Sequence, residues 1–232
     1  MSGGFFSSSS SQRPSIKLIG SILVVSVGFF AWVYPLGIEK RNIEIEVTKN
    51  AEKLGVDGIL SVVPYYNKPS QAGLLEHFGQ IAKCTNLPII LYNVPGRTGS
   101  NMTAITTLAI CKAVPQVIGI KESSTNLPQM MAVLTNAPEN FSLLSGDDNF
   151  TLPILSIGGV GAISVIANEM PNEVTQLIQS GLTGDWEKAR GLHYQLLPLM
   201  DANFIETNPQ PVKTALAMMG KIDEQFRLPL VP

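Results

Sequence analysis

Charged side chains are scarce in this sequence: Asp, Glu, Lys and Arg make up only 15% of its 232 residues, against about a quarter in an average globular domain. The formal net charge is −2, so no basic excess exists to neutralise phosphates, and we expect no nucleic-acid partner. A disordered chain is excluded as well, because disorder requires few apolar residues and 45% of these residues are hydrophobic. The length is sufficient to bury a core.

Cysteine and histidine are also rare, with two of each. The two cysteines, Cys84 and Cys111, are too few to staple a secreted domain, and no Cys/His cluster has the spacing of a zinc site. We therefore predict no metal site. His77, His193 and both cysteines are predicted to be ordinary helix residues without a polar partner.

One stretch has no charge at all, residues 18–38, which read LIGSILVVSVGFFAWVYPLGI. A membrane-spanning helix needs about twenty apolar residues, so a membrane anchor is one hypothesis. One or two buried strands are another, because Ile22–Val27 is rich in β-branched residues and periodicity does not separate the two cases. A third is a segment foreign to the domain that follows. The Ser-rich residues 1–15 are predicted to be a disordered leader.

From residue 41 onward, short apolar runs alternate with helical patterns. We expect helices over 42–54, 71–82, 103–113 and 127–136, and strands over 58–63, 88–93, 117–121, 141–146 and 159–165. Such alternation predicts parallel strands joined by crossover helices, in an α/β sheet or a (β/α) barrel. After Glu169 the strands stop, and three helices form a small C-terminal helical region, the last of them capped by Asn208.

The ends of the predicted strands carry the candidate chemistry, because ligands meet the carboxyl ends of parallel strands. Lys121 ends an uncharged run and should lie at the mouth of an apolar interior. Burial there lowers the pKa of its amine and favours Schiff-base chemistry with a carbonyl substrate. Tyr92 adds a phenol for proton transfer, and Arg97 adds a planar fork suited to a carboxylate. The alternative is a lysine that simply reaches solvent at a strand end.

Six motifs together resemble the dihydrodipicolinate synthase family, within the N-acetylneuraminate lyase superfamily. They are PYYNKP (64–69), YNVPGRTG (92–99), GIKES (119–123), SGDD (145–148), GGVGAIS (158–164) and ETNPQPVK (206–213). The resemblance implies an α/β fold, a partial TIM (β/α) barrel of about strands 4–8 with a small C-terminal helical region. The implied division is an unrelated segment at 1–40, the partial barrel at 41–168 and the helical region at 169–232.

The resemblance also implies a reaction, the Schiff-base condensation of pyruvate with L-aspartate-4-semialdehyde to 4-hydroxy-tetrahydrodipicolinate in lysine and diaminopimelate biosynthesis. Lys121 resembles the lysine that forms the imine with pyruvate, and Tyr92 resembles the proton-relay tyrosine. Tyr66 resembles the second relay tyrosine, which reaches into the neighbouring site across a dimer interface. Arg97 resembles the arginine that receives the semialdehyde carboxylate.

Further positions match residues around the family's site. Gly146 and Ile163 resemble residues whose backbone lines the pyruvate pocket, and Tyr65 resembles an interface tyrosine near a lysine feedback site. No metal or organic cofactor is implied, since the lysine itself is the electron sink. The resemblance further implies a homodimer or homotetramer in the cytoplasm, with a membrane-anchored form through Leu18–Ile38 as the alternative.

The family's Gly-Thr-Thr-Gly-Glu motif, whose threonines bind the pyruvate carboxylate and complete the relay, occurs nowhere in the 232 residues. Residues 1–40 are also too short for three further βα units, although the apolar residues 18–38 are long enough to cover an open sheet edge. We therefore expect very low synthase activity or none from this chain by itself, with imine formation as a separate question. A related sugar-acid aldolase and a non-catalytic remnant are the competing hypotheses.

Overall fold

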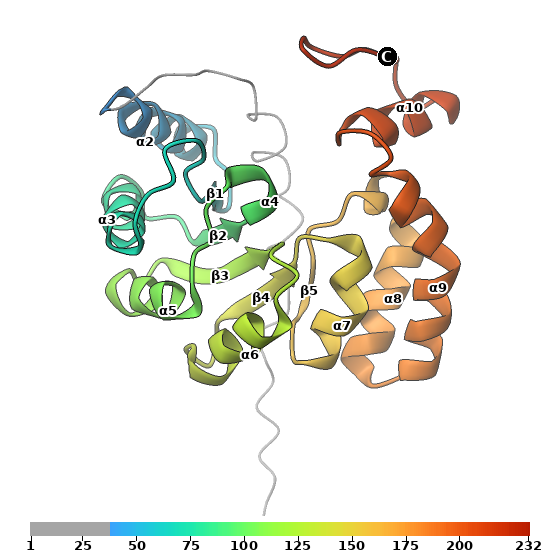
Figure 1. Ribbon diagram of the computed structural model, residues 1–232, viewed down its shortest axis with the longest axis horizontal. Coiled ribbons are helices and arrows are strands. Elements are labelled where there is room, and N and C mark those ends of the chain that lie inside the picture. The colour runs from blue at the N-terminus through green and yellow to red at the C-terminus, as the bar shows by residue number, and fades with distance from the viewer. Residues whose placement is uncertain (1–37) are drawn as a thin grey trace, which may run out of the picture.

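The structure is a computed structural model that describes residues 38–232, with side chains from residue 44 onward. Its centre is a five-stranded sheet in which every neighbouring pair is parallel, in the order β1-β2-β3-β4-β5 (Figure 1). The strands are β1 (Ile59–Val62), β2 (Ile89–Asn93), β3 (Val117–Glu122), β4 (Ser142–Ser145) and β5 (Gly161–Ala162). The predicted leader and all but the last residue of the uncharged stretch at 18–38 lie outside the described residues.

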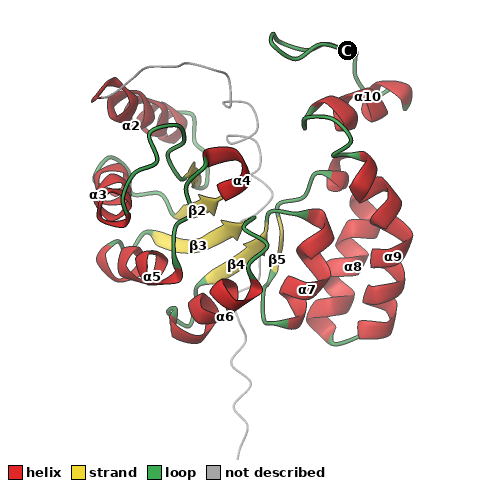
Figure 2. Cartoon of the chain, viewed as in Figure 1, coloured by secondary structure: helices red, strands yellow, loops and turns green. Residues whose placement is uncertain are grey.

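Helices follow the strands in the expected alternation (Figure 2). Those beside the sheet are α2 (Ile38–Lys53), α3 (Gln71–Ala82), α4 (Pro95–Thr98), α5 (Ala104–Ala113), α6 (Leu127–Asn136) and α7 (Thr151–Ser156), with short 3-10 helices η1 (Asp148–Phe150) and η2 (Ile166–Asn168). Figure 1 shows α2, α3, α5 and α6 along one face of the sheet. The C-terminal helices are α8 (Pro171–Thr183), α9 (Trp186–Ala202) and α10 (Gln210–Met218). The predicted α/β class and the helical C-terminal region are confirmed.

The sheet separates two apolar layers, because successive strand residues point to opposite faces. The larger layer lies between the sheet and helices α3, α5 and α6, and it includes Ile89 and Leu91 of β2. The intervening residue Ile90 lies on the other face, in a small cluster with Leu144 and Ile163. The face away from the helices is therefore apolar in its middle.

A β-bulge in β3 resets this alternation. On β2, Ile89 is paired with Val117, and the next residue, Ile90, is paired with Gly119. Ile118 therefore has no partner on β2, and 37% of it is exposed. One extra residue shifts every later side chain to the other face. Val117 and Ile120 consequently both lie in the helix-side core, although they are an odd number of residues apart. Lys121 therefore points away from the helices.

Helix boundaries follow local capping signals at several places. Ser70 caps α3, its hydroxyl accepting a hydrogen bond from the Gly73 N–H. The prediction for α10 is wrong, since Pro209 and not Asn208 stands at its N-cap. The GRTG segment contains a further difference, because the short helix α4 forms there and ends at Gly99, which has a left-handed φ of 68°.

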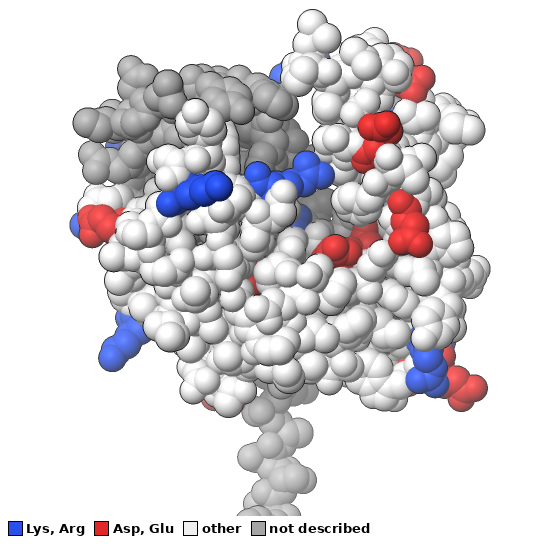
Figure 3. All heavy atoms as spheres, viewed as in Figure 1, with Lys and Arg blue, Asp and Glu red and all other residues white. Residues whose placement is uncertain are grey.

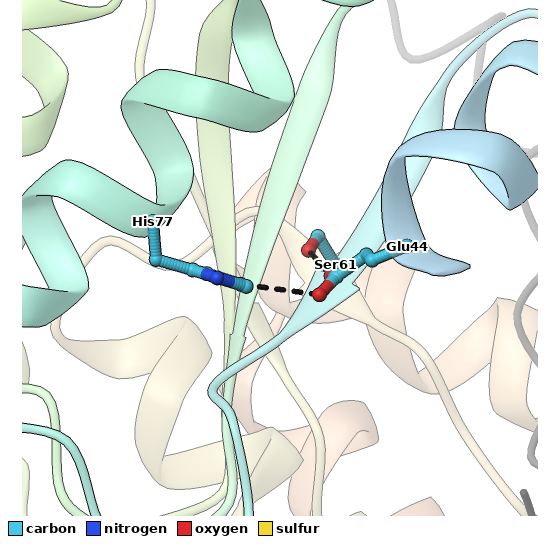
Figure 4. Close-up of polar contacts among 3 residues, drawn as sticks. All are labelled: Glu44, Ser61 and His77. Carbon is cyan, nitrogen blue, oxygen red and sulfur yellow. Dashed lines mark hydrogen bonds and ion pairs between the residues drawn. The ribbon is translucent and has the colours of Figure 1, made fainter. Parts of the chain in front are cut away.

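Helix α2 is tied to β1 and α3 by a polar cluster of three residues (Figure 4). The Ser61 hydroxyl donates a hydrogen bond of 2.7 Å to Glu44 Oε1, and His77 Nε2 lies 3.2 Å from Glu44 Oε2. The expectation that His77 has no polar partner is therefore wrong. The acid that faces it comes from a distant part of the chain, which no local pattern reveals.

The C-terminal helices have a core of their own. Residues from α7, η2, α8 and α9 form it, namely Leu155, Ile166, Val174, Leu177, Leu196 and Met200. None of the helices within residues 38–232 is long and apolar enough to cross a membrane. Most of the face shown in Figure 3 is uncharged, in keeping with the composition, and its central basic side chains face acidic ones on the side of the C-terminal helices.

Candidate active site

Lys121 and Tyr92 lie side by side at the carboxyl end of the sheet. The two residues are in register between β2 and β3, and the Lys121 Nζ lies 4.2 Å from the centroid of the Tyr92 ring. Both side chains face away from helices α3 and α5. The structure thus brings together two of the residues that the strand-end pattern predicted.

The surroundings of Lys121 favour its neutral amine. The pKa of Lys121 is lowered to about 8, mainly by burial; the Asp148 carboxylate raises it and the Arg97 guanidinium lowers it by smaller amounts. At neutral pH roughly one lysine in ten is then unprotonated, far more than for an ordinary lysine. A neutral amine at a strand end is the species that attacks a carbonyl carbon.

The pKa of the Tyr92 phenol is raised, in contrast to that of Lys121. Burial raises its pKa, and the Asp147 carboxylate raises it too, whereas the neighbouring Ser123 hydroxyl and the Arg97 guanidinium lower it. Arg97 therefore acts electrostatically on both Tyr92 and Lys121, from its place on the exposed helix α4. The role of Arg97 toward a substrate carboxylate stays a prediction.

Gly146 closes the site directly after β4. A Cβ atom added there would lie 2.0 Å from Ser123 Oγ and 2.8 Å from Lys121 Cε, so only a glycine lets both side chains approach the backbone. The Gly146 N–H donates to the Glu122 carbonyl at 2.9 Å, which holds this backbone against β3. Ile163, also predicted for the pocket, is buried in the apolar cluster with Ile90 and Leu144, and its N–H donates to the Ser145 carbonyl.

The buried Asp148 holds the loop after β5. Its Oδ2 accepts hydrogen bonds from the N–H groups of Val165 and Ile166, at 2.9 and 3.0 Å. The same carboxylate raises the pKa of Lys121. Asp148 thus connects the position of that loop with the charge of the lysine, a role that the sequence pattern did not assign to it.

Tyr65 and Tyr66 follow β1 in the loop that the PYYNKP motif forms. Tyr66 has a left-handed backbone, with φ at 71°, and 63% of it is exposed. Tyr65 is half-buried. The structure does not bury Tyr66 together with Lys121, and the relay and interface roles of these two tyrosines stay predictions.

A buried carboxyl that the motif analysis passed over lies on the other face of β3. Glu122 is 1% exposed, and its carboxylate accepts hydrogen bonds from Asn93 Nδ2, the Ser124 N–H and Gln129 Nε2. Asn93 in turn accepts the Met102 N–H. Because Asn93 and Glu122 directly follow Tyr92 and Lys121, this network fixes the two strand ends that carry the site. The feature of the sequence that could have indicated this network is Glu122 itself, an acidic residue at the end of a largely apolar strand.

Within the part of the chain whose side chains are described, no group of three or more His, Cys, Asp or Glu residues is arranged to hold a metal ion. The free cysteines, Cys84 and Cys111, lie on helices α3 and α5 or next to them, and away from this site. The expectation that Cys84 has no polar partner is wrong, because its thiol donates to the Gln80 carbonyl at 3.2 Å. Burial raises the pKa of the Cys111 thiol to about 11. The nucleophile that the geometry offers is thus Lys121.

Comparison with known proteins agrees with this geometry. The model of the dihydrodipicolinate synthetase family matches residues 37–232. The chain belongs to this family. Its relatives in the dihydrodipicolinate synthetase family include the 4-hydroxy-tetrahydrodipicolinate synthase of Koribacter versatilis, 52% identical over 178 residues, which are 77% of this chain and 59% of that protein. The synthase of Chlorobium chlorochromatii is 44% identical over 95% of this chain and 75% of its own length.

Solved structures of dihydrodipicolinate synthases have the same fold. The Thermotoga maritima enzyme superposes with a TM-score of 0.81 at 44% identity, covering 83% of this chain and 66% of the other. The Aquifex aeolicus enzyme gives 0.79 at 45% identity, covering 81% and 64%. The five-stranded sheet and the C-terminal helices thus correspond to part of the fold of these dihydrodipicolinate synthases. The chain spans about three-fifths of the length of several of these relatives.

Proposed function

We propose that this chain carries the Schiff-base site of a 4-hydroxy-tetrahydrodipicolinate synthase, with Lys121 as the nucleophile toward pyruvate. One observation supports this most strongly: Lys121 is half-buried at the carboxyl end of a parallel sheet, with its Nζ 4.2 Å from the centroid of the Tyr92 ring. The relatives named as 4-hydroxy-tetrahydrodipicolinate synthases support the same proposal.

In the proposed reaction, the neutral Lys121 amine attacks the keto carbon of pyruvate. A C–N bond forms, and the keto oxygen leaves as water once it has received two protons, giving an imine. Loss of a methyl proton then gives an enamine, whose carbon forms a C–C bond with the aldehyde carbon of the semialdehyde. The amino group of the product closes the ring and frees the lysine.

The other predicted residues have proposed roles in these steps. Tyr92 would move protons at the lysine nitrogen, and Tyr66 would serve the same relay. Arg97 would bind the semialdehyde carboxylate through its planar fork. Gly146 and Ile163 would line the pyruvate pocket, with Gly146 leaving room beside Lys121.

Reductive trapping tests the proposal directly. The full chain, incubated with pyruvate and borohydride, should gain a single reduced pyruvate adduct, and peptide mapping should place it on Lys121. Lys121→Arg should abolish the adduct, whereas Lys112→Arg, at an exposed lysine on α5, should retain it. An unmodified wild-type chain, or an adduct that survives Lys121→Arg, would refute Lys121 as the nucleophile.

Turnover is a separate measurement, because the threonine motif is absent from the sequence. Groups that act together in catalysis lose most of their effect when one member is missing. We therefore keep the prediction that this chain by itself condenses the two substrates very slowly, even if it traps pyruvate. Turnover at the rate of an ordinary synthase would contradict it, and faster turnover with a sugar acid would favour the aldolase hypothesis.

Assembly and location complete the proposal. We place residues 41–168 in the partial barrel and residues 169–232 in the helical region, with assembly into a homodimer or homotetramer through the loop of Tyr65 and Tyr66. Light scattering of the wild type and of Tyr66→Ser tests the assembly. We propose the cytoplasm as the location, and fractionation of cells with and without residues 1–40 tests the membrane-anchored alternative.

A further inference from the structure

Ser123 shares a sheet face with Lys121 and continues the strand that carries it. The hydrogen-bond ladder extends past the end of β3, because the Ser123 N–H donates to the Asn93 carbonyl at 2.9 Å. The alternation of side chains therefore extends too. Ser123, two residues after Lys121, points to the site, while the intervening Glu122 points to the helices.

The Ser123 hydroxyl lies in the middle of the site. Its Oγ and the Lys121 Cε both approach the same point beside Gly146, the position where a Cβ would stand. The Oγ atom is buried and is not in hydrogen-bond geometry with any described residue. It is nevertheless close enough to the Tyr92 phenol to favour the ionised form of that group. The hydroxyl is thus buried among the reacting groups, and the group that it acts on is the Tyr92 phenol.

The next residue provides a contrast. The Ser124 hydroxyl accepts a hydrogen bond from the Asn126 N–H, and the Ser124 N–H donates to Glu122 Oε1, so Ser124 has an ordinary role in the turn before α6. A buried hydroxyl with no partner costs stability relative to a hydrogen-bonded one. No hydrogen bond within the fold accounts for the position of the Ser123 hydroxyl beside Tyr92.

We propose that Ser123 is a positioning residue of this site, which donates a hydrogen bond to the Tyr92 oxygen when that phenol gives up its proton. The inference rests on the proposed function. In it, Ser123 acts through Tyr92, stabilising the phenolate formed when a proton passes to the developing imine, and returning to its present position when the proton is regained. No bond is made or broken at Ser123 itself.

The first test needs no turnover and no substrate. Tyrosine labelled with ¹³C at Cζ reports the ionisation of each phenol by NMR, and Tyr92→Phe identifies the Tyr92 signal among the five tyrosines. Ser123→Ala should move the Tyr92 titration to higher pH, since it removes a donor to the phenolate, while the matched Ser124→Ala should not. An unmoved Tyr92 titration in Ser123→Ala would overturn the proposal, even if Lys121 forms the imine.

The second test follows the rate at which pyruvate is trapped on Lys121. Ser123→Ala should lower this rate about five- to tenfold, the effect of one hydrogen bond. In a Tyr92→Phe background the same substitution should change nothing further, because the two residues act in series. Equal losses in both backgrounds would overturn the proposal, whereas absence of trapping in the wild type would refute the proposed function and leave the NMR test decisive.

Discussion

Gly146 and Gly79 differ in what an added methyl group would meet. At Gly146 a Cβ would overlap Ser123 Oγ and crowd Lys121, whereas at Gly79, inside α3, nothing lies within 4 Å. We predict that Gly146→Ala slows pyruvate trapping at least about tenfold, since small displacements of reacting groups are costly. Gly79→Ala should leave trapping unchanged and stabilise the fold by about 0.5–1 kcal/mol.

Intact-mass spectrometry and urea unfolding of the two glycine variants check this prediction. Gly146→Ala must also keep the far-ultraviolet circular dichroism of the wild type, which separates a local clash from a folding failure. Trapping at the wild-type rate in Gly146→Ala would show that the site tolerates the methyl group. The close approach at Gly146 would then have no role in catalysis.

Arg97 tunes the charge of Lys121 from a separate helix. Because its guanidinium disfavours the ammonium form, the pKa of Lys121 should rise when Arg97 is replaced by Gln. In the wild type, trapping should accelerate with pH and level off above about pH 8, where the amine is neutral. In Arg97→Gln the midpoint of this rise should lie at higher pH. Trapping rates between about pH 6 and pH 10 measure it, and a midpoint that moves down or stays would contradict the prediction.

At the scale of elements, Glu44 provides the polar contacts of α2 with Ser61 of β1 and His77 of α3. Removing the carboxylate leaves the buried Ser61 hydroxyl without its acceptor, a loss of about 1–3 kcal/mol. We predict that Glu44→Ala destabilises the chain by this amount, and that Ser61→Ala in the same background recovers part of it. The exposed Glu46→Ala, on the same helix, is the matched control.

Urea unfolding of the wild type, Glu44→Ala, Ser61→Ala and the double variant gives the interaction energy of Glu44 and Ser61 as a double-mutant cycle. Strictly additive losses would show that the contact between α2 and β1 adds nothing to stability. His77 also contacts Glu44 (Figure 4), so His77→Gln in the Glu44→Ala background should cost less than in the wild type.

For the molecule as a whole, buried acids shape the pH dependence of stability. Burial raises the pKa of both Glu122 and Glu169 above the ordinary value for glutamate. The folded chain therefore holds these protons to a higher pH than the unfolded chain does. Stability from these groups is fully present below about pH 4.5 and declines as the pH rises through their raised folded-state pKa values.

Glu169 tests this sign, because its Oε2 accepts a 2.7 Å hydrogen bond from Asn203 while its Oε1 has no partner among the described residues. We predict that Glu169→Gln flattens the fall in unfolding free energy as the pH rises above about 4.5. Urea unfolding over a series of pH values measures the slope. If the unfolding free energy of Glu169→Gln falls with pH as steeply as that of the wild type, the prediction is wrong.

Local patterns in the sequence predicted most of the elements well. The strands at 58–63 and 88–93 formed within a residue or two of expectation, as β1 and β2, because their β-branched runs and flanking turns are local features. The short helix α4 escaped prediction, since PGRT has no apolar periodicity, and its turn depends on Pro95 and on the left-handed Gly99. Strand-end position and chemistry selected Lys121, Tyr92 and Arg97.

The sequence by itself determined the class of fold, the family motifs and the residue types of the site. Only the tertiary structure decided which of them meet. The bulge at Ile118 places Lys121 and Ser123 on the face of Tyr92, and Glu122 on the opposite one, although all three are neighbours in the chain. Likewise, no local pattern in the sequence predicted that Glu44 would contact Ser61. Local propensity depends on a few adjacent residues, whereas register and long-range contacts depend on how the whole sheet packs.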